Sequence, residues 1–120
     1  MRKTITINYK GISIFRMDFS DTKSEQEIYL IIDESIKYIR SKPYASVFAV
    51  TNMKNMYFNK TVASRFTKFV KENKPYIKKS AVFGMSGIAR VVFNGVMKAA
   101  GRDIRSFETE TQAKDFLLKP

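Results

Sequence analysis

The chain has no cysteine and no histidine among its 120 residues. Without cysteine it can form no disulfide, thiolate nucleophile or cysteine-ligated zinc site. Without histidine it has no Ser-His-Asp or Cys-His arrangement and no imidazole metal ligand. An enzyme would depend on a lone carboxylate such as Asp18, Asp21 or Glu72, with no second catalytic group at a usable spacing. We therefore expect a protein that is not an enzyme and that uses no metal or cofactor.

Long apolar runs are also absent, since none approaches the roughly 20 residues that cross a bilayer. The N-terminus is basic, but Asn8, Tyr9, Lys10 and Gly11 interrupt any signal-peptide core. Residues 1–120 suffice for a single domain with one hydrophobic core, and 44% of them are apolar. These features predict one cytoplasmic domain without a transmembrane segment.

Acidic residues are scarce, 11 against 22 basic ones, which gives a formal net charge of +11. The excess is concentrated in residues 46–80, where Glu72 is the only acid. This concentration predicts a basic patch, and such patches attract phosphate-bearing partners such as nucleic acid. A solvated lysine-rich surface explains the same composition, and no nucleic-acid-binding motif accompanies it. We therefore treat weak nucleic-acid association as the lesser alternative.

Strands and helices are expected in a regular order. Polar and apolar residues alternate over 5–9, Lys10-Gly11 indicates a turn, and 12–19 is again rich in β-formers, which predicts a hairpin. Ser24 and Glu27 match a capping box before a helix. Further strands are expected over 45–51, 80–85 and 104–107, and further helices after Asn59, from Gly87 and after Thr109. This order predicts an α/β fold: an N-terminal β-hairpin followed by βα units, with a mostly parallel five-stranded sheet and four helices.

The most informative joint is Met85-Ser86-Gly87, where a buried strand leads into a helix. The carboxyl edge of a parallel sheet commonly binds ligands, and a helix start offers free N–H groups. Ser86 as an ordinary helix cap explains the same residues, and we favour that explanation. The start of the helix after Asn59 is expected at the same edge. The candidate anion- or ligand-binding set is therefore Asn59, Lys60, Thr61, Ser86, Gly87 and Arg90.

The helix over 87–100 is apolar on most sides, with Arg90, Asn94 and Lys98 in one narrow polar stripe. Such a helix needs cover beyond its sheet-facing side. We therefore expect it to bind a partner protein or a second copy, most simply in a homodimer. The residues expected at this interface are Val92, Phe93, Val96 and Met97.

A carrier or sensor of a small anionic or lipid-like ligand is the alternative from another functional class. It would need a deep apolar cavity beside Phe83, Phe93 and Met97, whereas a solid core would count against it.

The expected order of elements, with the residues at its joints, resembles the STAS superfamily, specifically the SpoIIAA-like group of small bacterial proteins. The resemblance covers nearly the whole chain. The segments that carry it are Met17–Ser20, Asn73–Lys78, Ala81–Gly87, Gly101-Arg102, Phe107–Thr109 and Ala113–Leu117. It implies a domain of this size that has no reaction of its own and acts as a regulatory or interaction module.

The better-known relatives, the anti-sigma factor antagonists, bind a partner protein and are switched by phosphorylation of a serine that opens a helix. The resemblance places Thr61 at the position of that serine. The surrounding motif departs from the Asp-Ser-Ser-Gly type, because Asn59, Lys60 and Val62 replace its acidic residue, first serine and glycine. Asn and Thr are also ordinary residues at a helix start. Phosphorylation of Thr61 is therefore an implication of the resemblance only.

Overall fold

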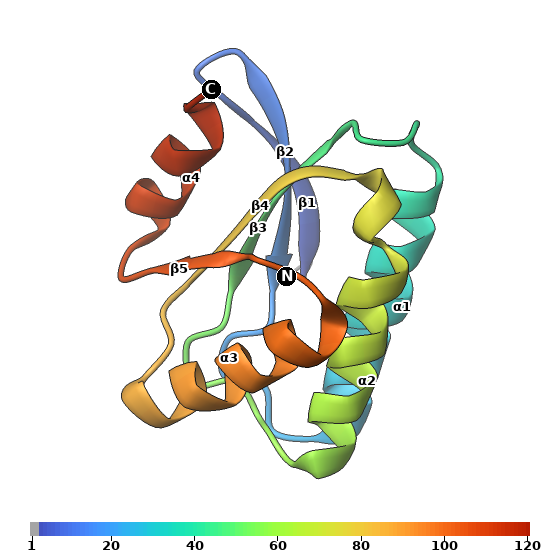
Figure 1. The fold of residues 1–120 in the computed structure, drawn as a ribbon, viewed down its shortest axis with the longest axis vertical. Coiled ribbons are helices and arrows are strands. Elements are labelled where there is room, and N and C mark those ends of the chain that lie inside the picture. Colours follow the sequence, from blue (N-terminus) through green and yellow to red (C-terminus); the bar gives the residue numbers. More distant parts are fainter. Residues whose placement is uncertain (1–2) are drawn as a thin grey trace.

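Within residues 3–120, five strands form one sheet, in the same order along the sheet as along the chain (Figure 1). The computed structural model describes residues 3–120. β1 pairs antiparallel with β2, and β2, β3, β4 and β5 pair in parallel. The strands are β1 (Thr4–Tyr9), β2 (Ile12–Asp18), β3 (Val47–Asn52), β4 (Ile77–Phe83) and β5 (Arg105–Phe107). The predicted hairpin and mostly parallel five-stranded sheet are confirmed.

The four α-helices of the described part of the chain cover the sheet unequally. α1, α2 and α3 lie on one side and α4 lies alone on the other (Figure 1). Each side has its own apolar core, and the core beneath α1, α2 and α3 is the larger one. The helices are α1 (Glu25–Arg40), α2 (Lys60–Glu72), α3 (Gly87–Ala100) and α4 (Glu110–Leu118), and a short 3-10 helix spans Lys74–Tyr76.

The hairpin turn follows from the two residues that join β1 to β2. Lys10 and Gly11 both have positive φ, at 50° and 93°. A two-residue loop of this kind matches the twist of the flanking strands, and glycine adopts such a φ without steric cost. Tyr9 therefore lies directly opposite Ile12, and the register continues without a bulge to Thr4 opposite Met17.

A side-chain cap fixes where each of the helices α1, α2, α3 and α4 begins. Ser24 accepts a hydrogen bond from the backbone N–H of Glu27, as predicted. The Glu27 carboxylate, however, accepts from the N–H of Lys23 rather than from Ser24, so the predicted box is only half formed. Thr109 and Gln112 form the complete reciprocal box at the start of α4.

Strand β4 begins three residues earlier than the sequence pattern indicates. The sequence pattern predicts this strand over 80–85, but Ile77, Lys78 and Lys79 also belong to β4, which pairs there with the start of β3. The Lys78 and Lys79 ammonium groups lie over the rings of Phe48 and Phe116. The aliphatic stems of lysine can cover an apolar sheet face while the charge stays near water, which explains why a charged run forms a strand here.

Helix α4 is fastened to the hairpin by polar contacts. The Arg16 guanidinium donates two hydrogen bonds of 2.9 Å to the Glu110 carboxylate. These bonds lower the pKa of Glu110, since they stabilise its charged form. The Tyr9 hydroxyl donates to Asp115 at 2.6 Å. The last helix in the chain is thus tied to the first two strands.

Candidate functional site

Three aliphatic side chains are exposed near the start of α3. Ile88, Val91 and Val92 are 83%, 72% and 36% exposed. Their spacing of i, i+3 and i+4 places them next to one another on the helix surface. We call these three residues the α3 patch. Clusters of large exposed apolar side chains commonly mark surfaces that bind another protein.

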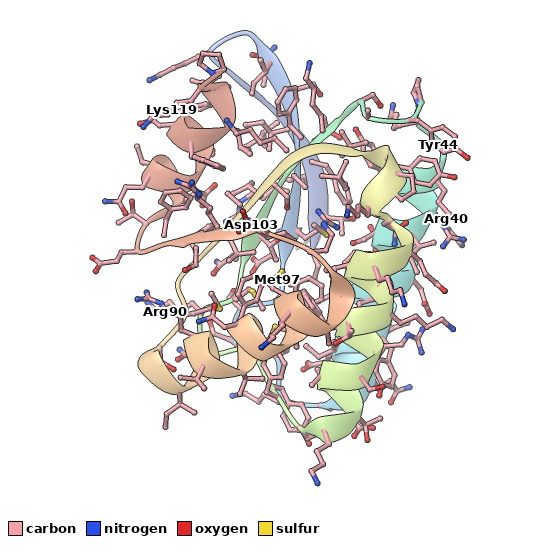
Figure 2. The ribbon with its side chains drawn as sticks, in the orientation of Figure 1. Arg40, Tyr44, Arg90, Met97, Asp103 and Lys119 are labelled. Atoms are coloured by element: carbon pink, nitrogen blue, oxygen red, sulfur yellow. The ribbon has the colours of Figure 1, made fainter. Side chains whose placement is uncertain are left out.

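The expected interface is wrong for three of its four residues. Phe93, Val96 and Met97 are buried, and they pack in the core that α3 shares with α2 and the sheet. Figure 2 shows Met97 on the side of α3 that faces the sheet. Of the expected set, only Val92 reaches the surface. The sequence could not separate the two faces, because apolar residues occur nearly all round this helix.

The start of α2 is capped by Asn59, not by Thr61. The Asn59 side chain accepts from the N–H of Val62 at 2.8 Å and donates to Glu25 and Tyr57. Thr61 is the second residue of the helix and is exposed, as is Lys60. Of the Asn and Thr residues at this helix start, Asn59 is the cap, and Thr61 lies two positions further on, inside the helix.

The start of α3 is organised by Ser86, which accepts a hydrogen bond from the N–H of Ala89. Gly84, at φ +87°, makes the turn before it, whereas Gly87 adopts no positive φ. Arg90 is exposed and lines an open hollow of about 500 Å³ at the β5 edge; Glu108, Asp115 and Lys119 also line this hollow. Among the charged residues that line the hollow, the two carboxylates balance the two cations in number.

The six candidate residues do not converge. α2 begins near the bottom of the molecule, whereas α3 begins well to one side of it (Figure 1). Asn59 is occupied by Glu25 and Tyr57, and Ser86 caps its own helix. The expectation of one phosphate site formed by both helix starts is therefore corrected. The physical reason is that α3 lies across α2, with its start directed away from the start of α2.

The carboxyl edge of the sheet is closed by hydrogen bonds between successive loops. Phe19 N–H donates to the Asn52 carbonyl at 2.9 Å, and Met53 N–H donates to the Phe83 carbonyl at 3.0 Å. Gly84 N–H continues the series to the Phe107 carbonyl at 3.2 Å. These backbone groups are satisfied by one another, so this edge offers few free donors to a ligand.

The acidic residues considered for catalysis have partners in the fold. Asp18 is buried and accepts from the N–H and hydroxyl of Ser20. Asp21 accepts from Asn55, and Glu72 lies 3.7 Å from Arg40. Each carboxylate therefore has a structural function.

A small cavity lies in the larger core, beside Phe93. Its volume is about 30 Å³, which is room for about one water molecule. Phe83 belongs to the other core, so it does not contribute. Arg102 reaches this cavity and donates to the carbonyl of Val70 at 2.6 Å; burial lowers its pKa. The cavity gives no support to a lipid-like ligand, which would need several hundred Å³.

The basic residues between 46 and 80 lie on two faces rather than in one patch. Lys68 lines a groove with Arg40 and Arg65 on the α1–α2 layer. Lys79 lies over Phe116 of α4, on the opposite side of the sheet. The expected single basic surface is corrected, because β4 directs its lysines away from α2.

Sequence reasoning missed an arrangement on the α4 side. Cations flank two aromatic rings in pairs there, Lys10 and Lys114 over Tyr9, and Lys79 and Arg105 over Phe116. No local signal could reveal this arrangement, because the two cations over each ring are distant from one another in the sequence.

No family model matches the chain, and no curated protein matches it either. Among the helices formed by residues 3–120, none is both long enough and apolar enough to cross a membrane.

Proposed function

We propose that this chain is a non-enzymatic interaction module of the STAS type that binds a partner protein through the α3 patch. The observation that carries the proposal is the exposure of Ile88, Val91 and Val92 on a helix whose opposite face is already buried. A folding role does not require these side chains, because α3 is anchored by Phe93, Val96 and Met97. Their exposure to water is best explained by a surface that another protein covers.

The STAS assignment is supported by the order of elements together with the residues at the joints. The non-enzymatic assignment is supported by the partners of Asp18, Asp21 and Glu72 within the fold. Phosphorylation of Thr61 remains a prediction of the resemblance. Its support is that Thr61 is exposed at a helix start, where a negative charge is favourable.

The partner should present an apolar surface bordered by carboxylates. The α3 patch supplies the apolar centre, and Arg90 and Lys98 on the same helix are exposed cations. The net charge of +11 favours approach of an acidic protein over a basic one.

The test compares the proteins retained by immobilised wild-type chain with those retained by Val91→Asp. We expect at least one acidic protein to be retained by the wild type and lost, at least tenfold, from the variant. Thr111→Asp is the matched control, since Thr111 is exposed on α4 and the charge change is identical. The purified partner should then bind the two chains with the same difference in affinity.

Stability separates a binding role from a folding role. Val91→Asp should change the free energy of unfolding by less than about 1 kcal/mol, as is usual for exposed positions. Equal retention of every protein by the wild type and Val91→Asp would contradict the proposal, and so would a wild type that retains none.

Polyanion association on the α4 side is a second candidate function. The observation that favours it is the pair of aromatic rings, Tyr9 and Phe116, each flanked by two cations. A positively charged surface with accessible rings is the usual arrangement for binding single-stranded nucleic acid without sequence preference.

Heparin binding tests this candidate. We expect the affinity for heparin to fall steeply with salt. Replacing Lys10 and Lys79 by Gln should weaken it severalfold more than replacing Lys60 and Lys71 of α2 by Gln, although both variants lose two charges. Equal losses from the two pairs would show that only the net charge matters.

A further inference from the structure

The outer edge of β1 is the longest open edge of the sheet. Within residues 3–120 no strand pairs with β1 on the side away from β2. The opposite edge, β5, has only three residues and begins with Arg105. β1 has six residues, Thr-Ile-Thr-Ile-Asn-Tyr, with no charge, no proline and no bulge. Proteins normally protect such edges with one of these devices.

Alternate residues of β1 direct their backbone groups outward. Asp18 N–H donates to the Lys3 carbonyl at 2.7 Å, so the backbone of Lys3 faces β2. Backbone direction alternates along a strand, so Ile5, Ile7 and Tyr9 also face β2. Thr4, Thr6 and Asn8 therefore present their N–H and C=O groups to the outside.

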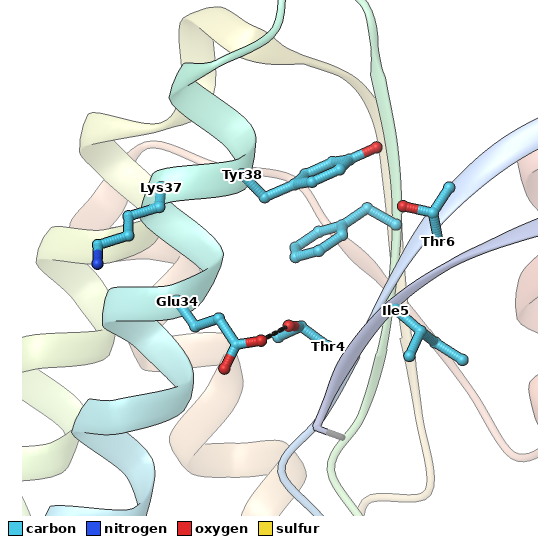
Figure 3. Close-up of a pocket in the computed structure, with 7 residues that line it drawn as sticks. Thr4, Ile5, Thr6, Glu34, Lys37 and Tyr38 are labelled. Carbon is cyan, nitrogen blue, oxygen red and sulfur yellow. Dashed lines mark hydrogen bonds between the residues drawn. The ribbon is translucent and has the colours of Figure 1, made fainter. Parts of the chain in front are cut away.

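A groove runs beside this edge. It has a volume of about 610 Å³ and is bordered by α1 and by Thr4, Ile5 and Thr6 (Figure 3). On the α1 side, Tyr38 stacks on Phe15 with ring centroids 4.2 Å apart. Helix α1 contacts both β1 and β2: Thr4 is buried and its hydroxyl donates to Glu34 of α1, whereas Thr6 and Asn8 on the outer edge are exposed.

We propose that β1 pairs antiparallel with β1 of a second copy about a two-fold axis at Thr6, which joins two sheets into one of ten strands. With Thr6 opposite Thr6 of the other copy, Thr4 lies opposite Asn8 in both directions. All three outward-facing residues of each strand are then paired. Three such pairs exchange about six N–H···O=C bonds.

The side chains of β1 are complementary to themselves in this register. Ile5 meets Ile7 of the other copy on the α4 side, and Thr meets Thr or Asn on the α1 side. Pairs of β-branched side chains across strands stabilise a sheet, and no charged pair falls within residues 4–8. Shifting the axis to Ile5 or Ile7 would leave one of the outward-facing residues unpaired. This self-complementarity favours a second copy over a foreign strand.

This dimer does not depend on the α3 patch, which lies on a different element. It also has a distinctive salt dependence. Each copy carries +11, so the copies repel one another, and salt that screens the repulsion should strengthen the dimer. Binding of an acidic strand at the same edge would weaken with salt instead.

A single introduced cysteine tests the register, because the chain has none of its own. In the proposed dimer the two Thr6 Cα atoms are about 5.5 Å apart, within the range that a disulfide spans. Thr6→Cys should therefore form a covalent dimer with oxidised glutathione, which accepts the two electrons. The rate should exceed that of Thr61→Cys, a control at another exposed threonine, at least tenfold.

Sedimentation of the full chain tests the dimer without a crosslink. We expect the wild-type dissociation constant to decrease between 50 mM and 500 mM salt. Thr6→Lys should raise it at least tenfold, because two lysines would face each other at the axis. Thr6→Val, which keeps the backbone donor and the β-branch, should leave it within threefold. Circular dichroism checks that each variant is folded. We expect both variants to fold, because Thr6 is exposed.

Two results would overturn the proposal. One is a wild-type chain that stays monomeric at high concentration and high salt. The other is a dimer that Thr6→Lys leaves intact and Val91→Asp dissociates, which would place self-association on α3. A dimer lost in Thr6→Lys while partner capture is unchanged would separate this interface from the proposed function of the α3 patch.

Discussion

Val96→Asp is expected to unfold the protein, whereas Val92→Asp should leave it folded. Val96 is 5% exposed, and it lies among the apolar side chains of the larger core. The substitution removes the burial of a branched side chain, which contributes roughly 1.5–3 kcal/mol. It also requires a carboxylate to be buried without a partner or to be protonated, at a cost of several kcal/mol more. The sum approaches the whole stability of a typical domain.

Val92 is the matched control, because it is the same residue type one turn earlier on the same helix. At 36% exposure its side chain can turn a carboxylate into water. We expect a loss of less than about 1 kcal/mol. Urea denaturation followed by circular dichroism measures both variants. A folded Val96→Asp variant would show that α3 is not packed as described and would restore Val96 as an interface residue.

This pair shows what the sequence could establish about α3. The apolar character of the helix predicted both a core face and an exposed apolar surface, and both exist. It could not assign residues to each face, because all of them are apolar. Nothing in the sequence distinguishes Ile88 and Val91, which are exposed, from Phe93 and Val96, which are buried. Only packing against α2 selects which of them are buried. Most residues of the expected interface therefore lie in the core, and the α3 patch could be identified only from the structure.

Amphipathic helices were predicted more fully. In α2 the spacing of Val62, Phe66, Phe69 and Val70 defines a single apolar stripe, and all four are buried. In α4, Ala113 and Leu117 are likewise buried, whereas Phe116, expected on the same inward face, is only partly buried. One-sided patterns of this kind leave a single way to bury apolar surface, so the sequence suffices.

The candidate site could not be predicted to the same extent, since it depends on the distances between elements. The order of elements implied that the starts of α2 and α3 share one edge of the sheet. It did not reveal that α3 crosses α2 and directs its start away. The open edge of β1 was similarly invisible, because a strand pattern does not state whether its outer side is covered.

Gly84→Ala should destabilise the protein by about 2 kcal/mol, because its backbone occupies a region that L side chains rarely adopt. Gly84 has φ +87°, and an added Cβ would lie 3.1 Å from Lys54 Cβ and 3.2 Å from Lys54 N. Neither contact can yield by rotation of a side chain, because Lys54 Cβ is bonded directly to the backbone and the nitrogen belongs to it. The loop of Lys54 is itself fixed, since its carbonyl accepts from Asp21 N–H at 3.0 Å.

Gly87→Ala is the control in the same turn, and its sign should be opposite. Gly87 is the first residue of α3, has no positive φ, and a Cβ there would meet nothing within 4 Å. Replacement should be neutral or should stabilise the protein by up to about 1 kcal/mol, since the unfolded chain loses freedom. Thermal unfolding should then show a melting temperature about 8 °C lower for Gly84→Ala and unchanged or higher for Gly87→Ala. Equal losses in both variants would mean that the turn tolerates no Cβ at either position, so that steric space rather than backbone conformation decides its sequence.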